Sequence, residues 1–298
     1  MDTPRFGRVL TAMATPFDER GELDLDGAAD LARHLVAAGN EGLVVAGSTG
    51  EGSSLSDQEK LDLFSCVAAA VSVPVLAGTS SPDTRHSVEL TRRASSTGVA
   101  GILATTPAYA RPSQSGLRDH LVALAEATDL PVMLYDIPVR TGRKIKAGTT
   151  HEIVKRCPNV LALKDASGEL VAAGELAYQT RGRLDLYSGD DSLTLAFLAL
   201  GAVGVVSVAG HWAAPELRRL VDSVVEGDLD TAREMHHRLA PSFEVETSEE
   251  YPNPVPTKAA LRCLGWPGGE CRAPLGRGDA VIEERVGRVI ADLRARRG

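Results

Sequence analysis

The stretch VLALKDASG, residues 160–168, joins a short, continuous aliphatic run to a lysine, Lys164. A run of this kind, without alternating polar residues, is typical of a strand that is covered on both faces, as the strands of parallel sheets are. Lysine is rarely buried unless it has a partner or a chemical role. The fold must therefore account for a strand with two covered faces, and the function must account for Lys164.

Runs of the same type recur along the chain, each bounded by Gly, Pro, Ser or Asp, and amphipathic helical patterns separate them. One of these helices is expected to begin at the capping-box pair Ser56 and Glu59, and another to end at Gly39. Eight strands alternating with eight helices predict an α/β fold, the (β/α)8 TIM barrel, rather than a doubly wound sheet, which usually has fewer strands. The doubly wound sheet stays open if one or two runs are not strands. The other seven runs are residues 8–15, 42–47, 74–79, 100–106, 131–136, 184–189 and 201–208.

The strand pattern stops after Ala213 and only helical patterns follow. We predict a barrel over residues 1–227 and a small C-terminal helical extension over 228–298. A proline-rich segment at 251–258 leads into one helix of the extension, and 279–297 reads as a final amphipathic helix. Because no low-complexity linker separates the two parts, the extension is not expected to fold independently.

Composition indicates a protein that acts on small molecules. The chain has 298 residues, 43% of them hydrophobic, and a formal net charge of -8, so it can bury a sizeable core. No Lys/Arg run interleaved with aromatic residues predicts nucleic-acid binding. No stretch reaches the roughly 18 apolar residues that a membrane helix needs. The first residues, with an acid at position 2, do not resemble a signal peptide, and a cytoplasmic location is expected.

Cysteine and histidine patterns predict neither disulfides nor a metal site. Without a CxxC pair, the cysteines are expected to be reduced thiols that are buried or half-buried. The histidines form no HxH or HExxH motif, so a metal-dependent mechanism is disfavoured. The cysteines are Cys66, Cys157, Cys263 and Cys271.

Candidate functional residues follow the predicted strands, because active residues of a (β/α)8 barrel lie at the carboxyl ends of the strands. The side chains expected at this end include two tyrosines, a serine, threonines, an arginine and a lysine. The segments are AGSTGEG (46–52), TTPAYARPSQ (105–114), LYDIPVRTG (134–142), Lys164, SGDD (188–191) and SVAGHW (207–212).

Lys164 is the candidate nucleophile. Desolvation in an apolar strand favours the neutral amine, which attacks a ketone to form an iminium, and the iminium then acts as an electron sink. Tyr135, one strand away, can carry protons to and from the intermediates. Two structural alternatives remain open from the residues alone. Lys164 could form a structural ion pair with Asp165 or another acid, and Tyr135 could be a core tyrosine whose hydroxyl bonds to the backbone.

Ser48 and Thr49 lie in a glycine-flanked turn, whose backbone N–H groups can hold a carboxylate while the hydroxyls relay protons. The turn lacks the spacing of a phosphate-binding loop. Arg140 could bind a second carboxylate through both of its terminal nitrogens, although an ordinary surface arginine is the alternative.

Taken together, these motifs resemble the dihydrodipicolinate synthase/N-acetylneuraminate lyase family, class I pyruvate aldolases on a (β/α)8 barrel. The resemblance covers nearly the whole chain. Its motifs are GSTGE (47–51), TPAYARPSQSG (106–116), LYDIPVRTG (134–142), LALKDASG (161–168), residues 187–208 and PNPVPTK (252–258).

The resemblance implies a role for each matching residue. Lys164 matches the lysine that forms the Schiff base with pyruvate, and no other cofactor is implied. Tyr135, Ser48 and Tyr109 match the members of a proton relay, and Tyr109 reaches into the neighbouring subunit's site, so a homo-oligomer, a dimer or a tetramer, is expected. The substrate-binding matches are Thr49 for the pyruvate carboxylate, Arg140 for the carboxylate of the aldehyde, and Gly189 and Val206 for backbone that lines the pocket.

Arg140 and the segment YARPSQSG (109–116) resemble the synthase branch. This branch condenses pyruvate with L-aspartate 4-semialdehyde in lysine and diaminopimelate biosynthesis. The alternative is another pyruvate aldolase or dehydratase of the family, acting on a sugar acid, sialic acid or 4-hydroxy-2-oxoglutarate. One departure is Ser48, where synthases usually carry threonine. Serine keeps the hydroxyl but lacks the methyl group that restricts rotation.

A second departure concerns feedback inhibition. Members of the family that lysine inhibits carry His, Asn, Glu and Tyr at four positions that differ in this chain. A cationic Lys60 and the missing acid at His86 would disfavour a bound lysine's ammonium group. We therefore predict that lysine does not inhibit the protein. The four positions are Lys60, Pro82, His86 and Ala108.

Overall fold

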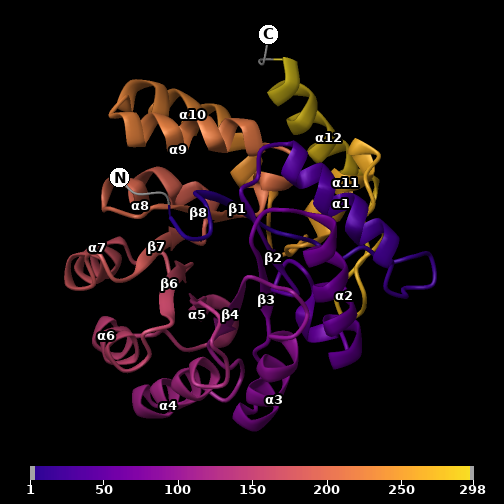
Figure 1. Cartoon of the computed structure of the whole chain (residues 1–298). Coiled ribbons are helices and arrows are strands. Elements are labelled where there is room, and N and C mark those ends of the chain that lie inside the picture. Colours follow the sequence, from indigo (N-terminus) through magenta and orange to yellow (C-terminus); the bar gives the residue numbers. More distant parts are fainter. Residues whose placement is uncertain (1–3, 296–298) are drawn as a thin grey trace.

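The structure, a computed structural model, describes residues 4–295. Eight parallel strands pair in sequence order and β1 closes the ring on β8, so the predicted (β/α)8 barrel is confirmed (Figure 1). All eight predicted runs contain a strand; most strands are shorter than their runs by one to four residues. The strands are β1 (Val9–Ala12), β2 (Gly42–Val45), β3 (Val75–Gly78), β4 (Gly101–Thr105), β5 (Val132–Asp136), β6 (Val160–Asp165), β7 (Asp185–Ser188) and β8 (Gly204–Ser207).

Helices surround the strands, and side-chain caps fix where several of them begin. Ser56 and Glu59 form the predicted capping box at the start of α2, and Asp24 caps α1. Three single-turn 3-10 helices and the short helix α5 lie after strand ends, and the sequence pattern does not predict them. The helices of the barrel are α1 (Leu25–Ala37), α2 (Asp57–Ala70), α3 (Thr84–Ala94), α4 (Gln114–Ala125), α5 (Pro138–Thr141), α6 (Ala147–Arg156), α7 (Leu170–Gln179), α8 (Thr194–Ala199) and α9 (Ala214–Glu226), with η1 (Gly52–Ser54), η2 (Asp191–Leu193) and η3 (Ala209–His211).

Three helices follow Gly227, which ends α9 in the left-handed region. They are α10 (Leu229–Val245), α11 (Val255–Leu264) and α12 (Ala280–Ala295). They lie on the side of the barrel that holds β8 and β1 (Figure 1). Their apolar residues form one buried cluster with residues of these two strands, among them Val9 and Val205. This shared core is the physical reason to expect that the extension depends on the barrel for its folding.

The inside of the barrel is a separate core of apolar side chains, including Leu10, Leu76, Met133 and Ala162. Tyr187 belongs to this core, and its hydroxyl donates to the backbone oxygen of Gly7 at 2.9 Å. The interior is therefore filled, as in other barrels of this size, and the functional side chains are confined to its carboxyl end.

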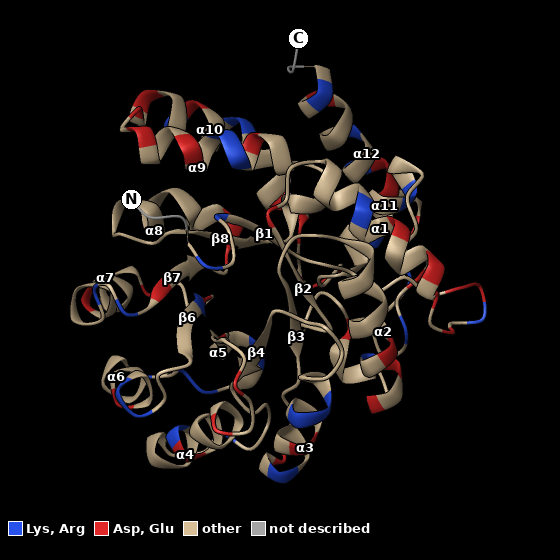
Figure 2. Ribbon diagram, in the orientation of Figure 1, with Lys and Arg blue, Asp and Glu red and all other residues tan. Residues whose placement is uncertain are grey.

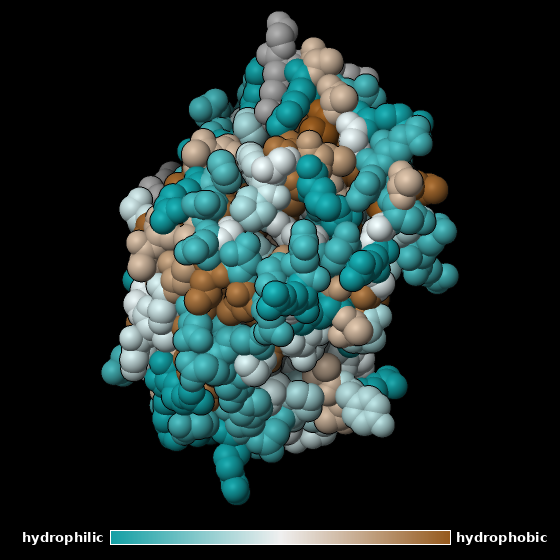
Figure 3. Space-filling view, turned by 90° about the vertical axis from the view of Figure 1, so that its right-hand side faces the viewer, coloured by the Kyte–Doolittle hydropathy of each residue, from teal (hydrophilic) through white to brown (hydrophobic). Residues whose placement is uncertain are grey.

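Charged residues of both signs are interspersed over the outer helices (Figure 2). The face seen in Figure 3 is mostly hydrophilic, with small hydrophobic areas between. No helix within residues 4–295 is long and apolar enough to cross a membrane. The four cysteines are free, but the expectation that all are buried or half-buried is wrong for Cys263, which is exposed.

Candidate active site

Lys164 and Tyr135 lie side by side at the carboxyl ends of β6 and β5, where they are register partners. Each is 4% exposed, and the Lys164 Nζ atom lies 4.3 Å from the centre of the Tyr135 ring. No ion pair within residues 4–295 includes Lys164, and the neighbouring Asp165 accepts from the backbone N–H of Ser167. The open alternative of a Lys164–Asp165 ion pair is therefore not what the structure contains.

Gly189, after β7, lies against the stem of Lys164. A Cβ atom built at Gly189 would be 3.0 Å from the Lys164 Cγ atom and 2.8 Å from the Cβ atom of Ala166. A side chain here would have to displace the lysine. Val206, on β8, belongs to the same interior cluster as Tyr135. Four of the predicted site residues thus converge within the mouth of the barrel.

The turn after β2 carries Ser48, which is half-buried, and Thr49, which is 3% exposed. The turn is tight, because a Cβ atom at Gly50 would be 2.9 Å from the backbone oxygen of Met13. The hydroxyl of Thr15 donates to the Gly50 oxygen at 2.6 Å and ties the turn to the loop after β1. The predicted carboxylate-binding turn is therefore a rigid element with little room for larger residues.

Arg140 lies in α5, after β5, and is exposed. Its Nη2 atom donates to the backbone oxygen of Asn253 at 3.0 Å. The side-chain amide of Asn253 in turn donates to Thr49 Oγ1 at 2.9 Å. Asn253, which comes just before α11, thus bridges the two predicted carboxylate sites. Asn253 lies in the PNPVPTK motif (252–258), but the motif alone does not predict this bridging role.

Tyr109 does not join this group. Its side chain is 96% exposed and its backbone has a φ of 67°, an uncommon value for a residue other than glycine. The loop around it is fixed by Arg143, whose Nη2 atom donates to the backbone oxygen of Arg111 at 2.9 Å. Within a single chain the tyrosine therefore projects outward from an ordered loop.

Buried carboxyl groups lie near the strand ends of the site: Asp136 is the last residue of β5, and Asp191 begins η2 after β7. Burial raises the pKa of Asp136 to about 6, although Lys144, at 3.3 Å, opposes the shift. Asp191 accepts from the backbone N–H groups of Val208 and Ala209 at 2.6 and 3.1 Å. Burial and the nearby Asp191 raise the pKa of Glu246, at the end of α10, well above its usual value. Burial also raises the pKa of Asp191, so these two adjacent carboxyl groups do not both ionise readily.

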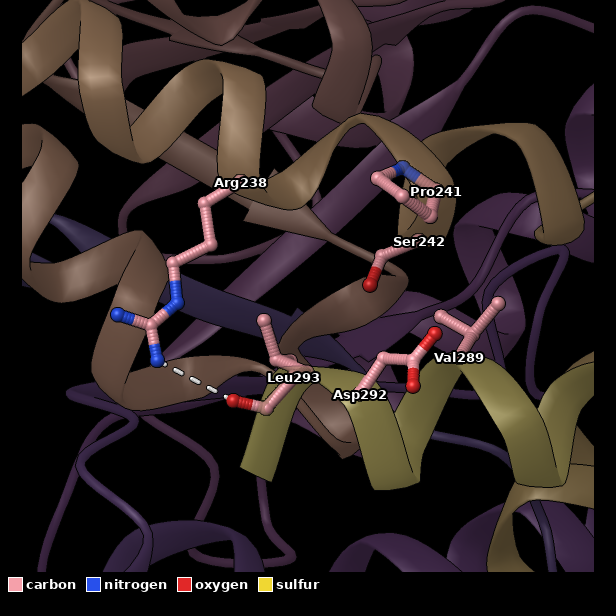
Figure 4. A pocket seen from close by; sticks show the side chains of 6 residues that line it. All are labelled: Arg238, Pro241, Ser242, Val289, Asp292 and Leu293. Atoms are coloured by element: carbon pink, nitrogen blue, oxygen red, sulfur yellow. Dashed lines mark hydrogen bonds between the residues drawn. The ribbon is translucent and has the colours of Figure 1, made fainter. Parts of the chain in front are cut away.

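The structure also bears on metal binding and on one small cavity outside this mouth. Within residues 4–295 no group of three His, Cys, Asp or Glu side chains could hold a metal ion. The small cavity in Figure 4 lies between α10 and α12, where the guanidinium of Arg238 donates to the backbone oxygen of Leu293 at 3.2 Å. Its volume of about 30 Å³ holds one water molecule rather than a substrate.

Comparisons with known proteins agree with this arrangement. The model of the dihydrodipicolinate synthetase family matches residues 5–293. The 4-hydroxy-tetrahydrodipicolinate synthase of Synechococcus sp. (strain JA-2-3B'a(2-13)) is 47% identical over 272 residues, which are 91% of this chain and 88% of that protein. The 4-hydroxy-tetrahydrodipicolinate synthase 2 of Streptomyces coelicolor is 48% identical over 272 residues, 91% of this chain and 89% of that protein. The crystal structure of DHDPS from Cyanidioschyzon merolae with lysine bound has a TM-score of 0.94 at 41% identity and covers 98% of this chain and 99% of its own.

Proposed function

The chain belongs to the dihydrodipicolinate synthetase family, and we propose that it catalyses the reaction for which its relatives are named. This is the condensation of pyruvate with L-aspartate 4-semialdehyde to 4-hydroxy-tetrahydrodipicolinate, a step toward lysine and diaminopimelate. The observation that carries the proposal is the buried Lys164, which has no acidic partner among residues 4–295, beside Tyr135 at the catalytic end of the barrel.

The chemistry begins with attack of the Lys164 amine on the keto carbon of pyruvate. Loss of water gives an iminium, which accepts electron density when a proton leaves the methyl carbon. The resulting enamine carbon attacks the aldehyde carbon, and the aldehyde oxygen becomes a hydroxyl. The amine of the second substrate then attacks the iminium carbon, closes the ring and releases Lys164. One water is lost overall, and no metal or further cofactor is required.

Tyr135 is the proposed proton carrier for these steps, because its ring contacts the amine that becomes the iminium. Ser48 is the proposed second member of the relay. Thr49 and the backbone of its turn are proposed to hold the pyruvate carboxylate, while Arg140 binds the carboxylate of the aldehyde. Gly189 leaves the space beside Lys164 in which the adduct forms.

We further propose that the site is completed by a second subunit through Tyr109. A tyrosine that is 96% exposed on an ordered loop is unfavourable in a lone chain but is typical of an interface residue. Val139, in α5, is 86% exposed, and Val171 and Tyr178 on α7 add a second exposed apolar area. These two areas support a homo-oligomer, a dimer or a tetramer.

Trapping of the covalent intermediate tests the proposal. The protein is incubated with pyruvate and borohydride, and a reduced adduct on Lys164 is expected by mass spectrometry. Absence of an adduct would remove the aldolase function altogether. With an adduct established, initial rates with L-aspartate 4-semialdehyde are compared with rates for sugar-acid and 4-hydroxy-2-oxoglutarate partners, and the semialdehyde is expected to give the highest kcat/KM. A higher value for another partner would assign the chain to a different branch of the family.

A further inference from the structure

We infer that the buried ion pair between Glu51 and Lys258 positions the turn that binds the pyruvate carboxylate, so that α11 of the C-terminal extension controls pyruvate affinity. The inference rests on the proposed function, because it assigns Glu51 and Lys258 as positioning residues for the same site.

The pair is completely buried. The side chains of Lys258 and Glu51 are 1% and 0% exposed, and Lys258 Nζ lies 2.7 Å from Glu51 Oε1. Lys258 also donates to the backbone oxygen of Glu270 at 2.8 Å and lies 4.1 Å from the centre of the Phe17 ring. Removing two charges from water is costly, and an apolar pair of similar volume is often at least as stable. Stability alone therefore does not explain why the chain carries charges here.

Glu51 is the last residue of the turn that holds Ser48 and Thr49. Its backbone has a φ of 51°, in the left-handed region, and its N–H donates to the oxygen of Ser48 at 3.1 Å. A residue other than glycine pays about 1–2 kcal/mol for this conformation. The surrounding contacts must hold it there, and the side chain of Glu51 makes two of them, one to Lys258 and one from the backbone N–H of Arg272 at 2.8 Å.

Helix α11 reaches the same turn at a second point. The side chain of Asn253, two residues before α11, donates to Thr49 Oγ1 at 2.9 Å, and its own amide oxygen accepts from Thr257 at 3.1 Å. Asn253 and Lys258 are five positions apart, and they hold Thr49 and Glu51, which are two positions apart. Helix α11 and the segment that leads into it therefore hold both Thr49, the proposed carboxylate-binding residue, and Glu51, the last residue of its turn.

Arg272 secures this contact from the far side. Its guanidinium donates to the backbone oxygens of Gly21 and Ser54 at 2.8 and 3.0 Å and forms an ion pair with Glu59. The segment that follows α11 is therefore attached to the loops after β1 and β2. This attachment keeps Lys258 from moving away from Glu51.

Carboxylate binding by backbone N–H groups depends on their orientation before the substrate arrives, since reorientation during binding lowers affinity. A misplacement of about 1 Å can cost about 100-fold in rate. Loss of the charge pair would let the turn relax and would weaken pyruvate binding first. Lys164 lies on β6, across the barrel from the turn after β2. Its nucleophilic attack would be slowed only because pyruvate is placed less well.

The test compares Lys258→Met, Glu51→Gln and the double variant of both in the full-length protein. Each single variant leaves one buried charge without its partner, so we expect the KM for pyruvate to rise at least about tenfold, with a smaller change in kcat and in the KM for the aldehyde. The double variant removes both charges. It is expected to fold better than either single variant but to keep the raised pyruvate KM, because the turn is no longer held.

Glu283→Gln is the matched control. It breaks an ion pair, at 2.8 Å, between α12 and Arg262, which lies on α11 as Lys258 does. Within residues 4–295 Glu283 forms no hydrogen bond or ion pair with the turn, so this variant should leave the pyruvate KM unchanged. Glu51→Asp keeps the charge but shortens its reach, and provides a variant with a conserved buried charge if Lys258→Met does not fold. Its pyruvate KM should also rise.

Folded variants with an unchanged pyruvate KM, and with only a lower melting temperature, would overturn the inference and leave the proposed function intact. Failure of the proposed function itself has a different signature, since the unmodified protein would then form no borohydride-reduced adduct on Lys164.

Discussion

The Nζ atom of Lys164 lies 4.3 Å from the centre of the Tyr135 ring, and the two residues face each other in register on adjacent parallel strands. The amine and the phenol are therefore positioned by the barrel itself rather than by a loop. Lys164→Ala should abolish both activity and adduct formation. Lys164→Arg should do the same, because a guanidinium does not lose its proton.

Tyr135→Phe keeps the ring contact but removes the proton carrier, so kcat should fall by about 100-fold or more. Initial rates and adduct mass together check these outcomes, and a Tyr135→Phe enzyme with normal kcat would remove the assigned proton-carrier role.

Arg140 should discriminate between the two substrates. Its guanidinium is held by the backbone oxygen of Asn253 and is proposed to bind the carboxylate of the aldehyde. Loss of a hydrogen bond to a charged group costs about 1.5–3 kcal/mol. Arg140→Ala should therefore raise the KM for L-aspartate 4-semialdehyde by about 10- to 100-fold, while the rate of pyruvate adduct formation changes little. Equal damage to both would count against the assigned role.

Tyr109 should act across a subunit interface, because it is 96% exposed within one chain. Tyr109→Phe and Lys164→Ala homo-oligomers should each have low activity. When both variants are co-expressed with different tags and the mixed oligomer is purified, some sites combine Lys164 of one chain with Tyr109 of the other. Activity should return in the mixed oligomer. Mixed oligomers no more active than the two parents would show that Tyr109 serves its own chain or has no role.

Lysine should not inhibit the protein. The Nε2 atom of His86 lies 2.8 Å from a carboxylate oxygen of Asp57, and Lys60, on the same helix as Asp57, is buried. Where lysine-inhibited relatives are expected to carry a glutamate, this chain has His86, and the nearby Asp57 carboxylate is already paired with it. Within the described residues the region therefore provides no free carboxylate for the ammonium group of a bound lysine. Initial rates should be unchanged in millimolar lysine, and the Cyanidioschyzon merolae protein, whose structure contains lysine, is the comparison. A clear fall in rate would contradict the prediction.

The free energy of unfolding should decrease on acidification, because His211 is completely buried and is protonated more easily in the unfolded chain. Its Nε2 atom accepts from the backbone N–H of Ala14 at 3.1 Å, so the ring is neutral. Burial lowers the pKa of His211 to about 4. Because the unfolded chain binds this proton more readily, the contribution is fully present above about pH 6.5 and is lost as the pH falls toward 4.

The size of this effect is on the order of 3 kcal/mol. Urea unfolding at several pH values measures it in the unmodified protein and in His211→Gln, which keeps an acceptor and a donor but does not titrate. The variant should show a flatter dependence between these pH values. Parallel curves for the two proteins would mean that other groups cause the loss.

Much of the fold could be predicted from local sequence, because strands covered on both faces need continuous apolar runs and helices need periodic ones. Residues 160–165 form β6 without any change of boundary, and the Ser56 capping box is present in α2. Strand ends were less accurate. Residues such as Val208 and Thr79 continue the apolar or β-branched run but already belong to loops.

The candidate residues at the strand ends follow from strand order alone, since parallel strands of a barrel bring their carboxyl ends to one mouth. The sequence by itself therefore determined the barrel and placed Lys164, Tyr135 and Gly189 there. Only the tertiary structure decided that Lys164 has no acidic partner in the described part of the chain, that Asn253 bridges Thr49 and Arg140, and that Glu51 pairs with Lys258. Thr49 and Asn253 are 204 positions apart in the chain. No periodicity or short motif specifies a contact over such a separation, because it depends on how the C-terminal extension packs against the barrel.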